Sequence, residues 1–145
     1  MAQARQVATR VEFYLKLEVT LKKISKNKAI HKVKPEGVEV WYYLFPEYQI
    51  HYNEQLPHTT QQWHFHKKIH ESLFVFEGEL EAYWEENGDK KSQTLKAGDL
   101  VETGNLNHTF ENKSDKVAKF FVLKQVLSGE DKSEIFLRDK YKEKK

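Results

Sequence analysis

Apolar residues alternate with polar ones through much of this chain, with the period of two that a half-buried β-strand produces. The longest alternation runs from Val11 to Leu21 and favours a long strand. A helix is the competing interpretation, because leucine, lysine and glutamate are also good helix formers. As a strand, this segment would extend a sheet or exchange with a partner subunit.

Shorter segments rich in aromatic and β-branched residues follow, and turn signals separate them. Pro46 stops one of these segments, and Asn87-Gly88 is a strong hairpin signal. The expected strands cover residues 29–33, 38–45, 48–52, 62–66, 73–76, 80–84, 93–95, 100–102, 108–112 and 117–127. A spacing of about eight to twelve residues is typical of an all-β jelly roll.

The chain is expected to hold one barrel, because its 145 residues suit a single core and no internal repeat is visible. We place this barrel at residues 35–127. Residues 1–34 would form an N-terminal extension that packs on the barrel or on a partner. The charged segment 128–145 contains the apolar group 135–137 and is expected to form a short helix that frays into a solvated tail.

Four residues in the middle of the chain form a pattern that calls for a chemical explanation. His64 and His66 share one face of an expected strand, with side chains roughly 6–7 Å apart, so both imidazoles can reach one ion. Glu71 can swing back across a turn and supply an anionic ligand, and His108 can close the set from another strand. Three neutral nitrogens and one carboxylate oxygen suit a divalent transition metal.

Two strings of residues resemble the two signatures of the cupin superfamily. They are His64-x-His66-x4-Glu71-x6-Gly78 and Gly98-Asp99-Leu100-Val101 running to His108-x3-Asn112. The resemblance covers about residues 58–112 and implies a single-domain cupin, a double-stranded β-helix or jelly-roll barrel of the conserved cupin 2 type. It also implies that iron, manganese, nickel or zinc binds at His64, His66, Glu71 and His108.

The sequence departs from the family pattern at two turns. His58 stands where the family usually has a glycine, and Gly104-Asn105-Leu106 replaces its Pro-x-Gly turn. The stretch from Gly98 to His108 is also one residue shorter than the common form. Glycine and asparagine both tolerate positive φ, so we expect the second turn to be rebuilt around Gly104 and Asn105.

Three more polar residues are candidates for the pocket around the metal. His51 and His58 lie just upstream of the first signature and could support a ligand or exchange a proton with a substrate. Asn112 follows His108 by four residues on the same strand face. It is expected either to orient a neighbouring group by hydrogen bonding or to end the strand in a turn.

The remaining histidines have simpler interpretations. His70 adjoins Glu71 and is an alternative ligand, but alternation along a strand directs the two side chains to opposite faces unless a turn intervenes. His31 is expected at the surface.

Composition excludes several classes of function. A net charge of +2 gives no strong field for nucleic acid. The sequence has no cysteine and so no disulfide framework, which fits a reducing compartment. No apolar run reaches the length of a signal peptide or a membrane span. We therefore expect a cytoplasmic protein that binds neither nucleic acid nor a membrane.

Four protein ligands on an ion that prefers six leave two positions for a substrate, dioxygen or water. The expected function is metal-dependent catalysis of dioxygenase, isomerase or lyase type on a small organic acid, aromatic or sugar-derived substrate. The metal would act as a Lewis acid or activate oxygen, with Glu71 as ligand and catalytic proton carrier. The alternative is a non-catalytic module that binds or senses a metal or small molecule. A homodimer is expected from the resemblance and from the long strand at residues 11–21.

Overall fold

The computed structural model describes residues 21–126 and 132–142. The long strand expected at residues 11–21 lies outside these residues, apart from Leu21. In chain order the elements are η1 (Lys26–Lys28), β1 (Ile30–Lys34), β2 (Val38–Leu44), β3 (Tyr48–Gln55), β4 (Thr59–Thr60), β5 (His64–Phe65), β6 (His70–Glu77), β7 (Glu79–Glu86), β8 (Asp89–Lys96), β9 (Leu100–Glu102), β10 (His108–Asn112), β11 (Ala118–Gln125), α2 (Ser133–Arg138) and β12 (Tyr141–Lys142).

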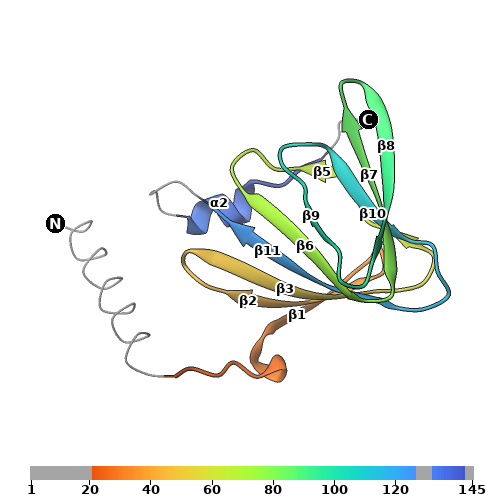
Figure 1. Cartoon of the computed structure of the whole chain (residues 1–145). Coiled ribbons are helices and arrows are strands. Elements are labelled where there is room, and N and C mark those ends of the chain that lie inside the picture. Colours follow the sequence, from red (N-terminus) through yellow and green to blue (C-terminus); the bar gives the residue numbers. More distant parts are fainter. Residues whose placement is uncertain (1–20, 127–131, 143–145) are drawn as a thin grey trace.

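Two antiparallel sheets face each other and enclose the core (Figure 1). The first sheet has the strand order β1-β2-β3-β11-β6-β9. The second has the order β12-β5-β10-β7-β8, with β4 also paired to β10. Strands far apart in the sequence are neighbours, as β11 is between β3 and β6. The all-β jelly roll expected from the strand spacing is confirmed.

Alternation along the strands sends one row of side chains inward and leaves the other outside. In β6, Leu73 and Val75 are buried, whereas Phe74 between them is 38% exposed. The buried apolar cluster consists of Val38, Val40, Leu73, Val75, Leu80, Ala82, Leu95, Phe110, Ala118, Phe120 and Val122. Burial of a side chain of this kind stabilises the fold by about 1.5–3 kcal/mol. This core holds the strands whose ends carry the polar residues described below.

At two turns, the backbone conformation determines which residue type fits. Gly78, between β6 and β7, has a φ of 76°, and a Cβ there would lie 3.1 Å from the Cα of Ala118. Both the backbone conformation and the approach of β11 therefore require glycine. His58 has a φ of 56° in the turn before β4. This left-handed conformation accounts for the glycine that the family usually has at that position.

The C-terminal segment returns to the barrel. The expected solvated tail begins with β12, which pairs with β5 in the register Tyr141 to Phe65. The two rings stack with centroids 5.1 Å apart. This contact helps to hold the charged segment against the sheet. No helix among the described residues is long and apolar enough to cross a membrane. The division at residues 34 and 127 and the cytoplasmic location stay predictions.

Candidate metal centre

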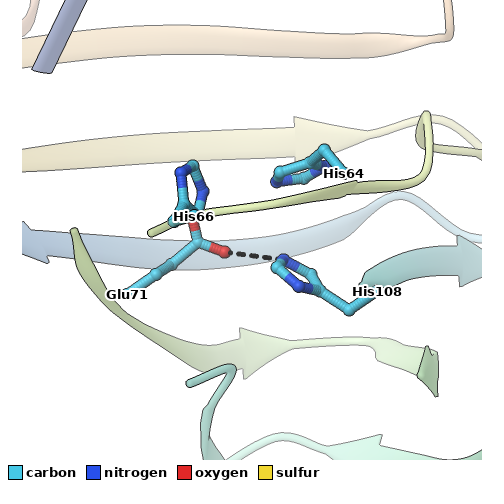
Figure 2. A group of neighbouring side chains, drawn as sticks. All are labelled: His64, His66, Glu71 and His108. Carbon is cyan, nitrogen blue, oxygen red and sulfur yellow. Dashed lines mark hydrogen bonds and ion pairs between the residues drawn. The ribbon is translucent and has the colours of Figure 1, made fainter. Parts of the chain in front are cut away.

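The four residues of the expected metal site come together at one end of the barrel. His64 lies in β5, directly opposite His108 at the start of β10. His66 follows β5, and Glu71 is the second residue of β6. All four side chains are buried, and Figure 2 shows them pointing toward one another.

One ligand atom from each of the four side chains can be chosen so that all lie within 4.8 Å of one another. Nε2 of His66 is 3.1 Å from Oε2 of Glu71, and Nε2 of His108 is 3.2 Å from Oε1 of the same carboxylate; the second contact is the dashed line in Figure 2. Two donors on opposite sides of one ion would be roughly 4 Å apart. The spacing therefore fits a single ion.

The other nitrogen of each imidazole is held by a backbone carbonyl. Nδ1–H donates to the carbonyl of Gln62 from His64 at 2.9 Å, to that of Asp139 from His66 at 2.8 Å, and to that of Leu106 from His108 at 2.7 Å. A carbonyl oxygen only accepts, so Nδ1 must carry the proton. A ring held in this way can present Nε2 to a metal as a lone pair, the arrangement that metal-binding histidines use.

Burial and the contacts within the cluster set the protonation of its groups. Burial lowers the pKa of His64 to about 3, so this imidazole is neutral near pH 7. Burial alone would raise the pKa of Glu71, but the contacts with His108 and His66 and the charge of Lys124 hold it well below its usual range. An ionised carboxylate thus faces the Nε2 atoms of His66 and His108 in a buried space, where each contact needs either a proton or a shared cation between its two atoms. The donor set fits a divalent cation, which satisfies all four groups at once.

The two histidines that were not expected to bind the metal, His70 and His31, lie outside the cluster. His70 is exposed while Glu71 beside it is buried, as strand alternation predicts. His31 is exposed, 2.6 Å from a carboxylate oxygen of Glu39, and its ring stacks on Trp41.

His51 lines a small cavity beside the cluster, together with His64 and Glu71. Its Nε2–H donates to Oε1 of Gln49 at 2.9 Å. Burial, followed by the charge of Lys124, lowers the pKa of His51 to about 2. The ring is therefore neutral near pH 7.

The structure separates His58 and Asn112 from that cavity. Nε2 of His58 lies 2.7 Å from Oδ1 of Asp115, and both side chains are exposed. Asn112 is fully buried at the far end of β10, where it donates to the carbonyls of Gln55 and Lys116. Neither residue lines the small cavity, because the turns that hold them lie away from the ligand cluster.

Two groups that the sequence did not single out belong to the site. Asp139 holds His66 through its carbonyl, and its carboxylate accepts from the backbone N–H of Lys68 and Ile69 at 2.7 Å each. Lys124 lies opposite Glu71 in the sheet, with Nζ 3.6 Å from Oε2. A lysine near the end of an expected strand and an aspartate after a short helix carry no local signal, so only the assembled fold reveals them.

The profile of the family described as Cupin domain matches residues 52–124, which is half of the chain. The chain belongs to the cupin family. The match contains the first signature and the second, including all four residues of the candidate metal centre. No curated protein sequence matches this cupin.

Solved structures share the cupin fold at low sequence identity. A variant of oxalate decarboxylase from Bacillus subtilis is 15% identical with a TM-score of 0.67, covering 86% of this chain and 33% of its own. An oxalate oxidase is 20% identical with a TM-score of 0.58, covering 72% and 59%.

Peruvianin-I from Thevetia peruviana latex, described as a cysteine peptidase, is 16% identical with a TM-score of 0.60 and 74% coverage of both chains. The cupin described here contains no cysteine, so it lacks the nucleophile that such a peptidase is named for. This cupin also spans only a third of the decarboxylase chain and 59% of the oxidase chain. At these identities, the three likenesses establish the fold.

Proposed function

We propose that this cupin is a metal-dependent enzyme whose ion is held by His64, His66, Glu71 and His108. The observation that carries the proposal is the set of three imidazoles, each with Nδ1–H bound to a carbonyl, arranged around one ionised carboxylate. Iron, manganese, nickel and zinc all accept such a set of nitrogen and oxygen ligands. Solved structures named as oxalate decarboxylase and oxalate oxidase share the fold, which supports this class of function.

The substrate class that we propose is a small organic acid, aromatic or sugar-derived molecule, with chemistry of dioxygenase, isomerase or lyase type. When bound, the metal supplies a Lewis acid or an oxygen-activating centre. Glu71 holds the metal and offers a carboxylate oxygen that can carry a proton. His51 lies beside the metal ligands as a neutral ring: its Nε2–H is committed to Gln49, and no described group hydrogen-bonds its Nδ1, which is left to accept a hydrogen bond from a substrate.

Elemental analysis of the purified protein tests the proposal, followed by oxygen uptake and product analysis with catechols, diketones and keto acids. We expect close to one metal ion per chain. Iron with oxygen consumption would place the protein in the oxygenase class, and turnover without oxygen in the isomerase or lyase class. A metal that binds these compounds without turnover would support a binding module instead. A protein that takes up none of the four metals overturns the proposal.

We also propose that the protein is a homodimer that pairs through the outside of its first sheet. Outward side chains that lie directly opposite one another cross all six strands of that sheet, and we call them the outer row. They are His31, Trp41, Tyr52, Phe121, Phe74 and Leu100. Phe74, Phe121 and Leu100 are 38%, 41% and 60% exposed, and an apolar row of this kind is typical of an interface.

Light scattering tests the dimer. We expect a mass of twice 17.3 kDa, and a shift toward the monomer when Phe74 is replaced by glutamate. Replacement of the exposed Lys96, on the other sheet, is the control. A mass of 17.3 kDa for the unmodified protein would remove the dimer from the proposal.

A further inference from the structure

A second and larger cavity adjoins the metal centre. The small cavity at the cluster has a volume of about 40 Å³, enough for little more than water. The second cavity, which we call the outer cavity, has a volume of about 530 Å³ and shares His51, Lys34, Lys124 and Lys140 with the first. Its size falls in the range of about 300–1,000 Å³ that is usual for small-molecule sites. His66 also lines it, so a molecule in the outer cavity lies beside the metal ligands.

Positive charge gathers where the two cavities meet. Lys34, Lys124 and Lys140 line both. Lys124 faces the carboxylate of Glu71, but among the described residues no carboxylate lies within ion-pair distance of Lys34 or Lys140. Burial, followed by the charge of Lys140, lowers the pKa of Lys34 to about 8. Lys34 is half-buried and Lys140 is exposed, and the two ammonium groups repel each other. Although the carboxylate of Glu36 also lines the small cavity, this pair of like charges favours an anion between them.

Apolar side chains form another part of the lining of the outer cavity. Ile30, Tyr42 and Leu44 line it from β1 and β2, and Phe136 and Leu137 from α2. Figure 1 shows α2 beside the end of β11. Ile30, Leu44 and Leu137 are 51%, 47% and 80% exposed, so this wall can still gain from covering by a ligand.

We propose that the outer cavity binds a monocarboxylate with an apolar body of about the size of a benzyl or branched alkyl group. The carboxylate lies between Lys34 and Lys140, and the apolar body packs between the first sheet and α2. This inference rests on the proposed function, because it names the substrate class of the same metal centre. A lining that combines charged and apolar side chains selects against both short acids and uncharged aromatic molecules.

Three probe compounds test the two halves of the site separately. Isothermal titration calorimetry of the full-length protein as purified would compare 3-phenylpropanoate, propanoate, which lacks the ring, and 3-phenylpropan-1-ol, which lacks the charge. We expect 3-phenylpropanoate to bind at least about ten-fold more tightly than either control, since each control loses one set of contacts. Equal affinity for the acid and the alcohol, or for the two acids, overturns the inference without any variant being needed.

Variants then assign the contacts. Lys34→Gln and Lys140→Gln should each weaken binding of 3-phenylpropanoate by about ten-fold and leave binding of the alcohol unchanged. Leu44→Ser, at a position 47% exposed, should weaken binding of 3-phenylpropanoate relative to propanoate. Lys96→Gln, on an exposed part of β8, is the matched control and should change neither. Unchanged affinity for 3-phenylpropanoate in the folded double variant of Lys34 and Lys140 overturns the inference.

Metal content measured on the same samples keeps the two proposals distinguishable. A full complement of metal with no preference among the three probes removes the inference and leaves the proposed function standing. A protein without metal that still prefers 3-phenylpropanoate removes the proposed function and supports the carboxylate site.

Discussion

The two ends of β10 carry buried polar residues on the same face, and their surroundings differ. At one end, Asn112 completes its hydrogen bonds: Nδ2 donates to the carbonyls of Gln55 and Lys116 at 3.0 and 2.8 Å, and Oδ1 accepts from the N–H and hydroxyl of Ser114. At the other end, His108 donates through Nδ1 to a carbonyl but presents Nε2 to an ionised carboxylate at 3.2 Å.

This difference separates a structural residue from a chemical one. A buried polar side chain whose donors and acceptors all find partners within the chain needs nothing further, and it stabilises the fold. The imidazole nitrogens and carboxylate oxygens of the candidate metal centre face one another in a buried space, and a bound cation would satisfy them together. In the sequence, His108 and Asn112 belong to the same signature, whereas the structure places them in different surroundings.

Removal of a ligand gives the largest expected effect. His66→Ala should lower metal affinity by more than about 100-fold, because loss of a direct ligand exceeds the roughly 10–100-fold effect of groups that only orient ligands. Elemental analysis after dialysis measures the loss. His31→Ala, at the surface, should retain the metal. Equal metal content in the two variants would contradict the assignment of His66 as a metal ligand.

Asn112→Ala tests the stabilising role of the hydrogen bonds at the other end of β10. We expect the free energy of unfolding to fall by about 2–4 kcal/mol, because buried carbonyls and an N–H lose their partner. Urea denaturation measures this change, and the metal content of the folded variant should match that of the unmodified protein. Asn105→Ala, in an exposed turn, should change the free energy of unfolding by less than about 0.5 kcal/mol. A folded Asn112 variant without metal would contradict the assignment.

Asp139→Ala tests whether the carbonyl that holds His66 depends on its own side chain. Loss of the two hydrogen bonds to the backbone of Lys68 and Ile69 should release the segment and weaken metal binding by about ten-fold. Asp139→Asn keeps an acceptor oxygen and should restore most of the affinity. Competition with a coloured chelator measures both, and equal affinity in the alanine and asparagine variants would show that the side chain does not position His66.

The pH dependence of stability distinguishes a buried histidine from an exposed one. Burial lowers the pKa of His51 to about 2 from 6.5, so between these values the unfolded chain binds a proton that the folded chain excludes. The free energy of unfolding of the metal-free protein should therefore fall as pH falls below 6.5, by up to about 1.4 kcal/mol per pH unit from this residue.

Urea denaturation of the metal-free protein between about pH 7 and pH 5 measures this dependence. His51→Gln should give a shallower slope, and His70→Gln, at an exposed position, should keep the original one. Identical slopes in the two variants would exclude His51 as a cause of the pH dependence.

The smallest effect is expected at His58. Glycine relieves the left-handed backbone but gains entropy in the unfolded chain, so His58→Gly should change the free energy of unfolding by less than about 1 kcal/mol. Metal content should stay constant, since the side chain is exposed beside Asp115. A loss of metal in this variant would return His58 to the site.

Alternation along the strands could predict the direction of the ligands. His64 and His66 are two residues apart, and Glu71 rather than His70 is buried, as a period of two requires. The lengths of the strands were harder to predict from the sequence. The sequence indicated only residues 93–95 of β8, because Asp89, Lys90, Lys91 and Ser92 are polar and exposed, and pairing with β7 decides their conformation.

Contacts between distant segments could not be predicted from local pattern. Lys34, Lys124 and Lys140 stand far apart in the chain, and only the sheet order and the return of the C-terminal segment bring them to one cavity. The bond from His66 to Asp139 uses a backbone carbonyl, which every residue has, so no residue type marks it. Asn112 was expected either to orient a neighbour or to end a strand, and its hydrogen bonds with Gln55, Lys116 and Ser114 secure the turn after β10.

The carbonyl of Asp139 has a consequence for the order in which the protein is made. The ribosome adds this residue after every strand from β1 to β11, so the nascent barrel can close while the ring of His66 still lacks its acceptor. In that intermediate, the partners of His64, Glu71 and His108 within the barrel are already present. The ring of His66 is therefore oriented last. If the proposed metal centre is correct, the ion is held firmly only once the C-terminal segment has docked, and we expect translation that stops shortly after β11 to yield a barrel that releases its metal easily.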